Sequence, residues 1–145
     1  MTGARPALVI GYGNTLRGDD ALGPRAADAV RGWGLPEVVA LSVTQLTPEL
    51  AEPLSAVNLA IFVDARLAAG EVEAHRLEPV EGASSFGHAT DPGRLLALAK
   101  LAYGRCPPAW LVTVPATDLG LAERLSPQAE RGLAAALGRI AQLLG

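Results

Sequence analysis

The stretch Ala7–Gly13, which reads Ala-Leu-Val-Ile-Gly-Tyr-Gly, decides how the rest of the chain is interpreted. Four apolar residues followed by closely spaced glycines predict a buried strand that enters a tight turn. A helical pattern of apolar residues follows between Leu22 and Val30, with Pro24 in its first turn. A buried strand joined to a helix is the repeating unit of an α/β fold.

The same two patterns alternate along the remaining sequence. Helix starts are indicated where a capping residue precedes a proline, at 47–48, 91–92 and 126–127. The charged, alternating segment 71–80 is typical of an exposed edge strand. Further strands are indicated at 38–43, at 59–63, which stops at Asp64, and at 109–114. We therefore predict one α/β domain over residues 1–145, with three layers: a twisted, mostly parallel, five-stranded sheet with helices on both faces.

Composition excludes several classes of function. The chain has 145 residues, of which 50% are hydrophobic, and a net charge of −3. Its 12 basic residues are scattered singly, so the sequence predicts neither a nucleic-acid surface nor a membrane surface. A single cysteine, Cys106, excludes an internal disulfide and a cysteine-based zinc site. The N-terminal residues do not resemble a signal peptide, and we expect the protein to be cytoplasmic.

Polar residues follow several of the predicted strands. Asp19 and Asp20 come after the first strand, Asp64 ends the third, and His88 lies in the Gly/Ser-rich loop 81–90. Ligands of open α/β sheets bind outside the carboxyl ends of the strands, where these segments should meet. Two carboxylates and an imidazole form an N/O ligand set that suits nickel or zinc and leaves coordination positions open.

Each of these residues also has a purely structural interpretation. Asp19 and Asp20 precede a helix and could simply cap it, while Asp64 could form a turn and His88 could be a solvated surface group. A dinucleotide site is disfavoured, because Leu16 stands where the third glycine of that motif is expected and two acids follow. From the residues alone, the metal hypothesis therefore rests on topology.

The stretch Val9–Gly23, VIGYGNTLRGDDALG, resembles the N-terminal motif of the hydrogenase maturation endopeptidases. The similarity extends over essentially the whole chain. It includes the acidic strand end 62–65, the histidine site 87–88, the closing strand 110–114 and the helix start 125–127. Members of this family remove a C-terminal peptide from the precursor of the [NiFe]-hydrogenase large subunit once nickel is in place.

The resemblance implies specific roles. Asp20, Asp64 and His88 correspond to the family's metal-site residues and would act in catalysis by engaging Ni²⁺ carried by the large-subunit precursor, the expected partner. Zn²⁺ or Cd²⁺ would be substitutes in vitro. Asn14 would support the loop or a contact with the substrate backbone, and Asp19 would support the loop by capping the following helix. Position 20 is Asp where some members have Glu.

The segment after the second strand departs from many members of the family. It contains Thr44 and Gln45 where an Asp-Gly-Gly turn is common, and it is similar to members that serve cytoplasmic hydrogenases. Because this segment is linked with the choice of cleavage site, Thr44 and Gln45 are predicted to recognise the substrate. Two other functions stay open: a non-proteolytic, metal-sensing assembly chaperone of the large subunit, and a peptidyl-tRNA hydrolase. The acidic net charge disfavours the second of these.

Overall fold

The protein, seen in a computed structural model that describes residues 6–80 and 91–145, is built on one sheet of five strands in the order β2-β1-β3-β5-β4. Strands β1, β2, β3 and β5 are parallel, whereas β4, at the edge, is antiparallel to β5. The elements are β1 Ala7–Tyr12, α1 Leu22–Gly32, β2 Val38–Val43, α2 Ala51–Ser55, β3 Leu59–Leu67, β4 Glu73–Leu77, α3 Pro92–Tyr103, β5 Ala109–Ala116 and α4 Pro127–Leu144. The predicted fold class is confirmed.

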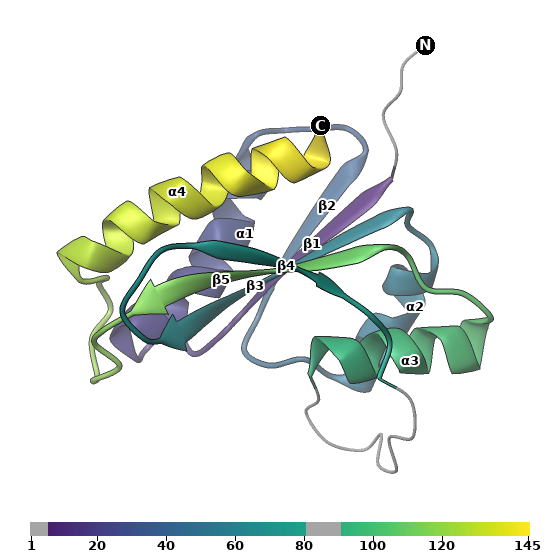
Figure 1. Cartoon of the computed structure of the whole chain (residues 1–145), viewed down its shortest axis with the longest axis horizontal. Helices are drawn as coiled ribbons and strands as arrows, with labels where there is room; N and C mark the ends of the chain where they lie inside the picture. The colour runs from purple at the N-terminus through teal and green to yellow at the C-terminus, as the bar shows by residue number, and fades with distance from the viewer. Residues whose placement is uncertain (1–5, 81–90) are drawn as a thin grey trace.

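Two layers of helices enclose the sheet (Figure 1). Helices α1 and α4 cover one face, and α2 and α3 cover the other. Successive side chains of a strand point to opposite faces, so Ile61 packs towards α1 and α4 while Ile10 and Phe62 pack towards α2 and α3. Tyr12 and Asp64 continue the rows of Ile10 and Phe62, and therefore lie on the α2/α3 face.

Strand β1 and helix α1 touch at two glycines. A Cβ at Gly11 would collide with the carbonyl oxygen of Gly23, and a Cβ at Gly23 would lie 2.6 Å from the carbonyl oxygen of Val63. Only glycine at both positions lets the helix approach this closely. The contact holds the start of α1, and the 3₁₀ turn Gly18–Ala21 before it, directly over the carboxyl ends of β1 and β3.

Three strands differ in length from the sequence predictions. β3 does not stop at Asp64 but continues to Leu67, and β5 continues to Ala116. The extra residues of the two strands pair with each other, Arg66 with Pro115 and Leu67 with Ala116. Strand β4 is shorter than the predicted 71–80, because only Glu73–Leu77 pair with β5. Asp64 is thus held inside a strand rather than in a turn.

The helix starts are where the prolines indicated. Asp91 accepts a hydrogen bond from the Arg94 amide at 2.8 Å, and Ser126 accepts one from the Ala129 amide at 3.1 Å. Thr47 differs, because its side chain makes no capping bond and the chain forms a 3₁₀ turn, Pro48–Leu50, before α2. Across the described ranges, none of the helices has the length and apolar character needed to span a bilayer.

Candidate functional site

Asp64 and Asp20 come together at the carboxyl ends of β1 and β3. Asp64 is half-buried on the α2/α3 face, and Asp20 is half-buried in the Gly18–Ala21 turn. Burial raises the pKa of Asp64 to about 6, and although the Tyr12 hydroxyl opposes this shift, repulsion from Asp20 adds to it. The charge of Asp20 is therefore close enough to Asp64 to affect its pKa.

Tyr12 is a site residue that the sequence analysis missed. Its hydroxyl donates a hydrogen bond to Asp64, and burial together with the nearby carboxylate raises the pKa of the phenol well above its usual value. The register could have revealed it: Gly11 pairs with Val63, so Tyr12 and Asp64 are the next residues on adjacent strands. Tyr12 therefore fixes the orientation of Asp64 while remaining protonated.

Asn14 connects the glycine turn to Asp20. The Asn14 backbone amide donates to Oδ2 of Asp20 at 2.7 Å, and the Asn14 side chain accepts from the Leu16 amide at 2.9 Å. Gly13 allows this geometry, because a Cβ there would collide with the Asp20 backbone carbonyl. The bond from the Asn14 amide occupies only one oxygen of the Asp20 carboxylate.

The sequence suggested that Asp19 caps the helix that follows it, but its side chain makes no capping bond there. Its carboxylate is fully buried and turns away from its own helix, towards the segment 117–126 that joins β5 to α4. Its Oδ1 accepts from the Ser126 amide at 2.8 Å. Its Oδ2 accepts from the Thr117 amide at 2.9 Å, the Asp118 amide at 3.0 Å and the Ser126 hydroxyl at 2.8 Å.

These donors determine the charge state of Asp19. Burial alone would raise its pKa, but hydrogen bonds from Ser126, Thr117 and Asp118 outweigh it and lower the pKa to about 2. The carboxylate also lies at the N-terminus of α4, where the helix dipole favours a negative charge. Asp19 is therefore a structural link that is ionised at neutral pH, distinct from the neighbouring Asp20.

His88 lies outside the described residues. Asp91, three residues further along the chain, is described, and its charge contributes to the raised pKa of Tyr12. The start of α3 is thus near the carboxylate pair. Within residues 6–80 and 91–145, no three His, Cys, Asp or Glu side chains gather into a group that could hold a metal ion.

Thr44 and Gln45 are exposed in the segment that leaves β2. The preceding residue, Val43, accepts a hydrogen bond from the Gly13 amide at 3.1 Å. This bond ties the predicted recognition segment to the turn that leads towards Asp20. The two residues therefore lie at the same edge of the sheet as the carboxylates, without contacting them in any recorded hydrogen bond.

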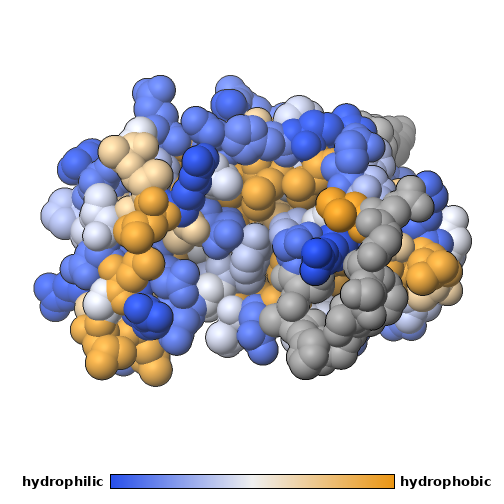
Figure 2. Space-filling view, turned by 60° about the horizontal axis from the view of Figure 1, so that its bottom comes forward, coloured by the Kyte–Doolittle hydropathy of each residue, from blue (hydrophilic) through white to orange (hydrophobic). Residues whose placement is uncertain are grey.

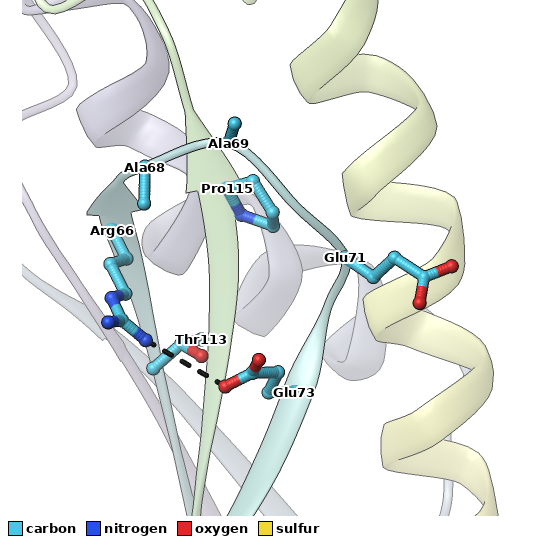
Figure 3. Close-up of a pocket in the computed structure, with 7 residues that line it drawn as sticks. All are labelled: Arg66, Ala68, Ala69, Glu71, Glu73, Thr113 and Pro115. Carbon is cyan, nitrogen blue, oxygen red and sulfur yellow. Dashed lines mark ion pairs between the residues drawn. The ribbon is translucent and has the colours of Figure 1, made fainter.

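A small polar recess lies between the ends of β3 and β5 and the edge strand β4 (Figure 3). Its volume is about 120 Å³, and the ends of β3 and β5 and the start of β4 form its walls. Thr113, which lines it, is the direct register partner of both Asp64 and Glu73. Arg66 and Glu73 face each other there with 3.7 Å between Nη1 and Oε1. The recess thus extends the site sideways, from Asp64 towards the edge strand.

A larger hollow, of about 770 Å³, lies at the opposite end of the sheet. It is lined mainly by apolar residues where the strands begin and α4 ends, with Glu37 as its charged side chain. Large apolar pockets with convergent polar groups are the usual candidates for small-molecule sites. This hollow lacks such a group of polar side chains, so the carboxylate pair remains the better candidate for chemistry.

Taken together, the fold and the site define an α/β protein with two neighbouring carboxylates at the carboxyl ends of its strands. No ion pair in the described part of the chain involves Asp20 or Asp64. A half-buried pair of acids without a basic partner attracts a cation. The arrangement can therefore supply two oxygen ligands to a divalent metal and leave further positions open.

Comparison with solved structures shows which proteins share this architecture. A hydrogenase 2 maturation peptidase from Thaumarchaeota archaeon SCGC_AB-539-E09 is 27% identical, with a TM-score of 0.74 over 97% of this chain and 98% of that one. The [NiFe] hydrogenase maturation protease HycI from Thermococcus kodakarensis KOD1 is 22% identical, with a TM-score of 0.74 over 98% and 94% of the two chains. The hydrogenase maturating endopeptidase HybD from E. coli is 23% identical, with a TM-score of 0.76 over 96% and 91%.

No protein-family model matches the sequence, and a comparison with curated proteins found no match either. The structural likeness nevertheless covers nearly the whole chain in each of these neighbours. The resemblance to hydrogenase maturation endopeptidases that the sequence indicated is confirmed at the level of the fold.

Proposed function

We propose that this protein is a cytoplasmic endopeptidase that removes the C-terminal peptide from a nickel-loaded [NiFe]-hydrogenase large-subunit precursor. The observation that carries the proposal is the pair Asp20 and Asp64, which has no cationic partner among residues 6–80 and 91–145. The pair lies on a fold shared along its length with proteins named as hydrogenase maturation proteases. The precursor would bring the missing cation as part of the substrate, so that only loaded precursor completes the site.

The two carboxylates have complementary tasks in this proposal. Asp64 lies beside Tyr12 within strand β3, and its pKa is raised mainly by burial and further by the charge of Asp20. Asp20 is held through Oδ2 by the Asn14 amide, which leaves Oδ1 available as a ligand. A metal ion bound there would polarise the scissile carbonyl or activate a water.

His88 is proposed as the third ligand. Its sequence neighbour Asp91 lies near Tyr12, and three residues of extended chain span at most about 11 Å. An imidazole would add a neutral nitrogen to the two carboxylate oxygens, a combination that suits nickel and zinc. Thr44 and Gln45, exposed at the same edge of the sheet, are proposed to contact the precursor.

The decisive experiment is an intact-mass measurement of a nickel-loaded large-subunit precursor with and without the protein. We expect a discrete mass loss that equals a C-terminal peptide. The variants Asp20→Asn, Asp64→Asn and His88→Ala should each reduce the rate by at least about 10²-fold, because each removes a metal ligand.

Two substitutions serve as matched controls. His75→Ala removes the other histidine, which is exposed and paired with Glu73 at 2.9 Å, and Asp28→Asn removes an exposed aspartate on α1. Both should cleave at the rate of the unmodified protein. An unchanged precursor mass with a stable complex would replace this proposal with the assembly-chaperone function. Normal cleavage by His88→Ala would overturn the ligand assignment alone.

A further inference from the structure

Asp19 is the most completely hydrogen-bonded side chain described in the molecule. It is 0% exposed, has no basic partner among the described ion pairs, and accepts bonds from Thr117, Asp118 and Ser126. A buried charge without a counter-ion is costly unless donors surround it. Donors that converge this closely on one carboxylate indicate a role beyond filling space.

Those donors all belong to one segment, 117–126, which is further linked to the turn by backbone bonds. The Asp19 amide donates to the Asp118 carbonyl at 2.7 Å, the Gly18 amide donates to the Ala122 carbonyl at 2.9 Å, and the Ala122 amide donates to the Leu16 carbonyl at 3.1 Å. The segment between β5 and α4 thus lies against the Gly18–Ala21 turn and is locked there by the Asp19 side chain.

The same turn carries Asp20, whose side chain points elsewhere. In a 3₁₀ helix there are three residues per turn, so consecutive side chains diverge by about 120°. Asp19 accordingly faces the segment 117–126, while Asp20 faces the Asn14 amide. The hydrogen bonds of Asp19 fix the rotation of the turn, and the direction of the Asp20 side chain depends on that rotation.

We propose that Asp19 is a positioning residue: its bonds to segment 117–126 set the rotation of the Gly18–Ala21 turn and so aim the Asp20 carboxylate at Asp64. The effect on activity rests on the proposed endopeptidase function. The effect on geometry is independent of that function, because it can be observed in the bond between the Asn14 amide and Asp20. This bond provides a readout that needs no substrate.

The test compares Asp19→Asn with the unmodified protein by NMR. The Asn14 amide proton should shift upfield and exchange with solvent about tenfold faster, because its acceptor has moved. Amides of β3, such as that of Phe62, should keep their protection. If the proposed function holds, precursor cleavage should show a lower kcat with an unchanged KM, since only the aim of Asp20 changes.

Asp118→Asn is the matched control. It removes one charge from the same segment, but the Asp118 side chain accepts only from the Gly120 amide at 3.0 Å and does not hold the turn. We expect the Asn14 resonance to be unaffected in this variant. A folded Asp19→Asn protein whose Asn14 shift and exchange rate equal those of the unmodified protein would overturn the proposal, whatever its activity.

Ser126→Ala covers the case in which Asp19→Asn does not fold. It removes one hydroxyl donor to Asp19 and leaves the carboxylate and the Ser126 amide bond in place. Because Ser126 also caps α4, exchange of the Ala129 amide separately reports the loss of the cap. Faster exchange at Asn14 would support the proposal, and exchange that changes at Ala129 alone would contradict it.

Discussion

Asp19 is buried and Asp64 is half-buried, yet their surroundings shift the pKa values of the two carboxyl groups in opposite directions. Hydrogen bonds from Ser126, Thr117 and Asp118 lower the pKa of Asp19 to about 2 against the effect of burial. Asp64 has the Tyr12 hydroxyl and its neighbouring backbone as donors, and burial with the charge of Asp20 raises its pKa to about 6. The number of donors, more than the depth of burial, separates a structural carboxylate from one available to a ligand.

The largest expected effect comes from deleting the donor-rich carboxylate. Asp19→Ala leaves the amides of Thr117, Asp118 and Ser126 without their acceptor at a partly buried position, which should cost about 2–4 kcal/mol of unfolding free energy. Urea denaturation at neutral pH measures it. Because the folded pKa of Asp19 lies below the ordinary 3.8, its contribution should fade as the pH falls from about 4 to about 2.

Asp118→Ala is the control for that measurement, since its exposed side chain makes one local bond and should change stability by no more than about 0.5 kcal/mol. If Asp19→Ala and Asp118→Ala lost the same unfolding free energy, the buried Asp19 would contribute no more to stability than the exposed Asp118.

A medium-sized effect is expected from the glycine contact that brings Asp20 towards Asp64. A Cβ in Gly23→Ala would press on backbone atoms of Tyr12 and Val63, which cannot move without shifting a strand. We expect a loss of about 1–3 kcal/mol in urea denaturation. Gly138→Ala, in α4 with nothing within 4 Å of its Cβ, should instead stabilise by about 0.5–1 kcal/mol. If Gly138→Ala lost more stability than Gly23→Ala, helix α1 would be able to move away from the strands at little energetic cost.

The smallest effects concern the titration of Asp64. Tyr12→Phe removes a donor and should raise the pKa of Asp64 above about 6, whereas Asp20→Asn removes a like charge and should lower it. Carboxyl ¹³C shifts measured against pH report both changes. Tyr103→Phe, at an exposed position of α3, should leave the titration of Asp64 unaltered. Shifts of the same sign in both site variants would contradict the assignment of causes.

The sequence predicted the architecture because its patterns are local. The apolar run after Ala7, the proline-marked helix starts and the charged edge segment each identify an element by composition alone, and all correspond to elements of the fold. The ends of strands were predicted less accurately. Strand β3 continues past Asp64 because Arg66 and Leu67 pair with β5, and a short stretch of sequence does not reveal the partner strand.

The site was only partly predictable for the same reason. The neighbouring positions of Asp20 and Asp64 follow from the topology rule for strand ends. The role of Asp19 does not, because its partners are 98 to 107 residues away and are mostly backbone amides, which carry no sequence signal. Tyr12 was missed because the register that places it beside Asp64 appears only once β1 and β3 are paired.

The long reach of Asp19 also bears on how the protein is made. A ribosome releases the glycine turn about a hundred residues before Ser126, at roughly 5–20 residues per second. During that interval the carboxylate can only be hydrated, and the aim of Asp20 is not yet fixed. Contacts so distant in sequence form late in folding. The link between the Gly18–Ala21 turn and segment 117–126 is therefore among the last contacts of the fold to form, after β5 and the start of α4 are in place.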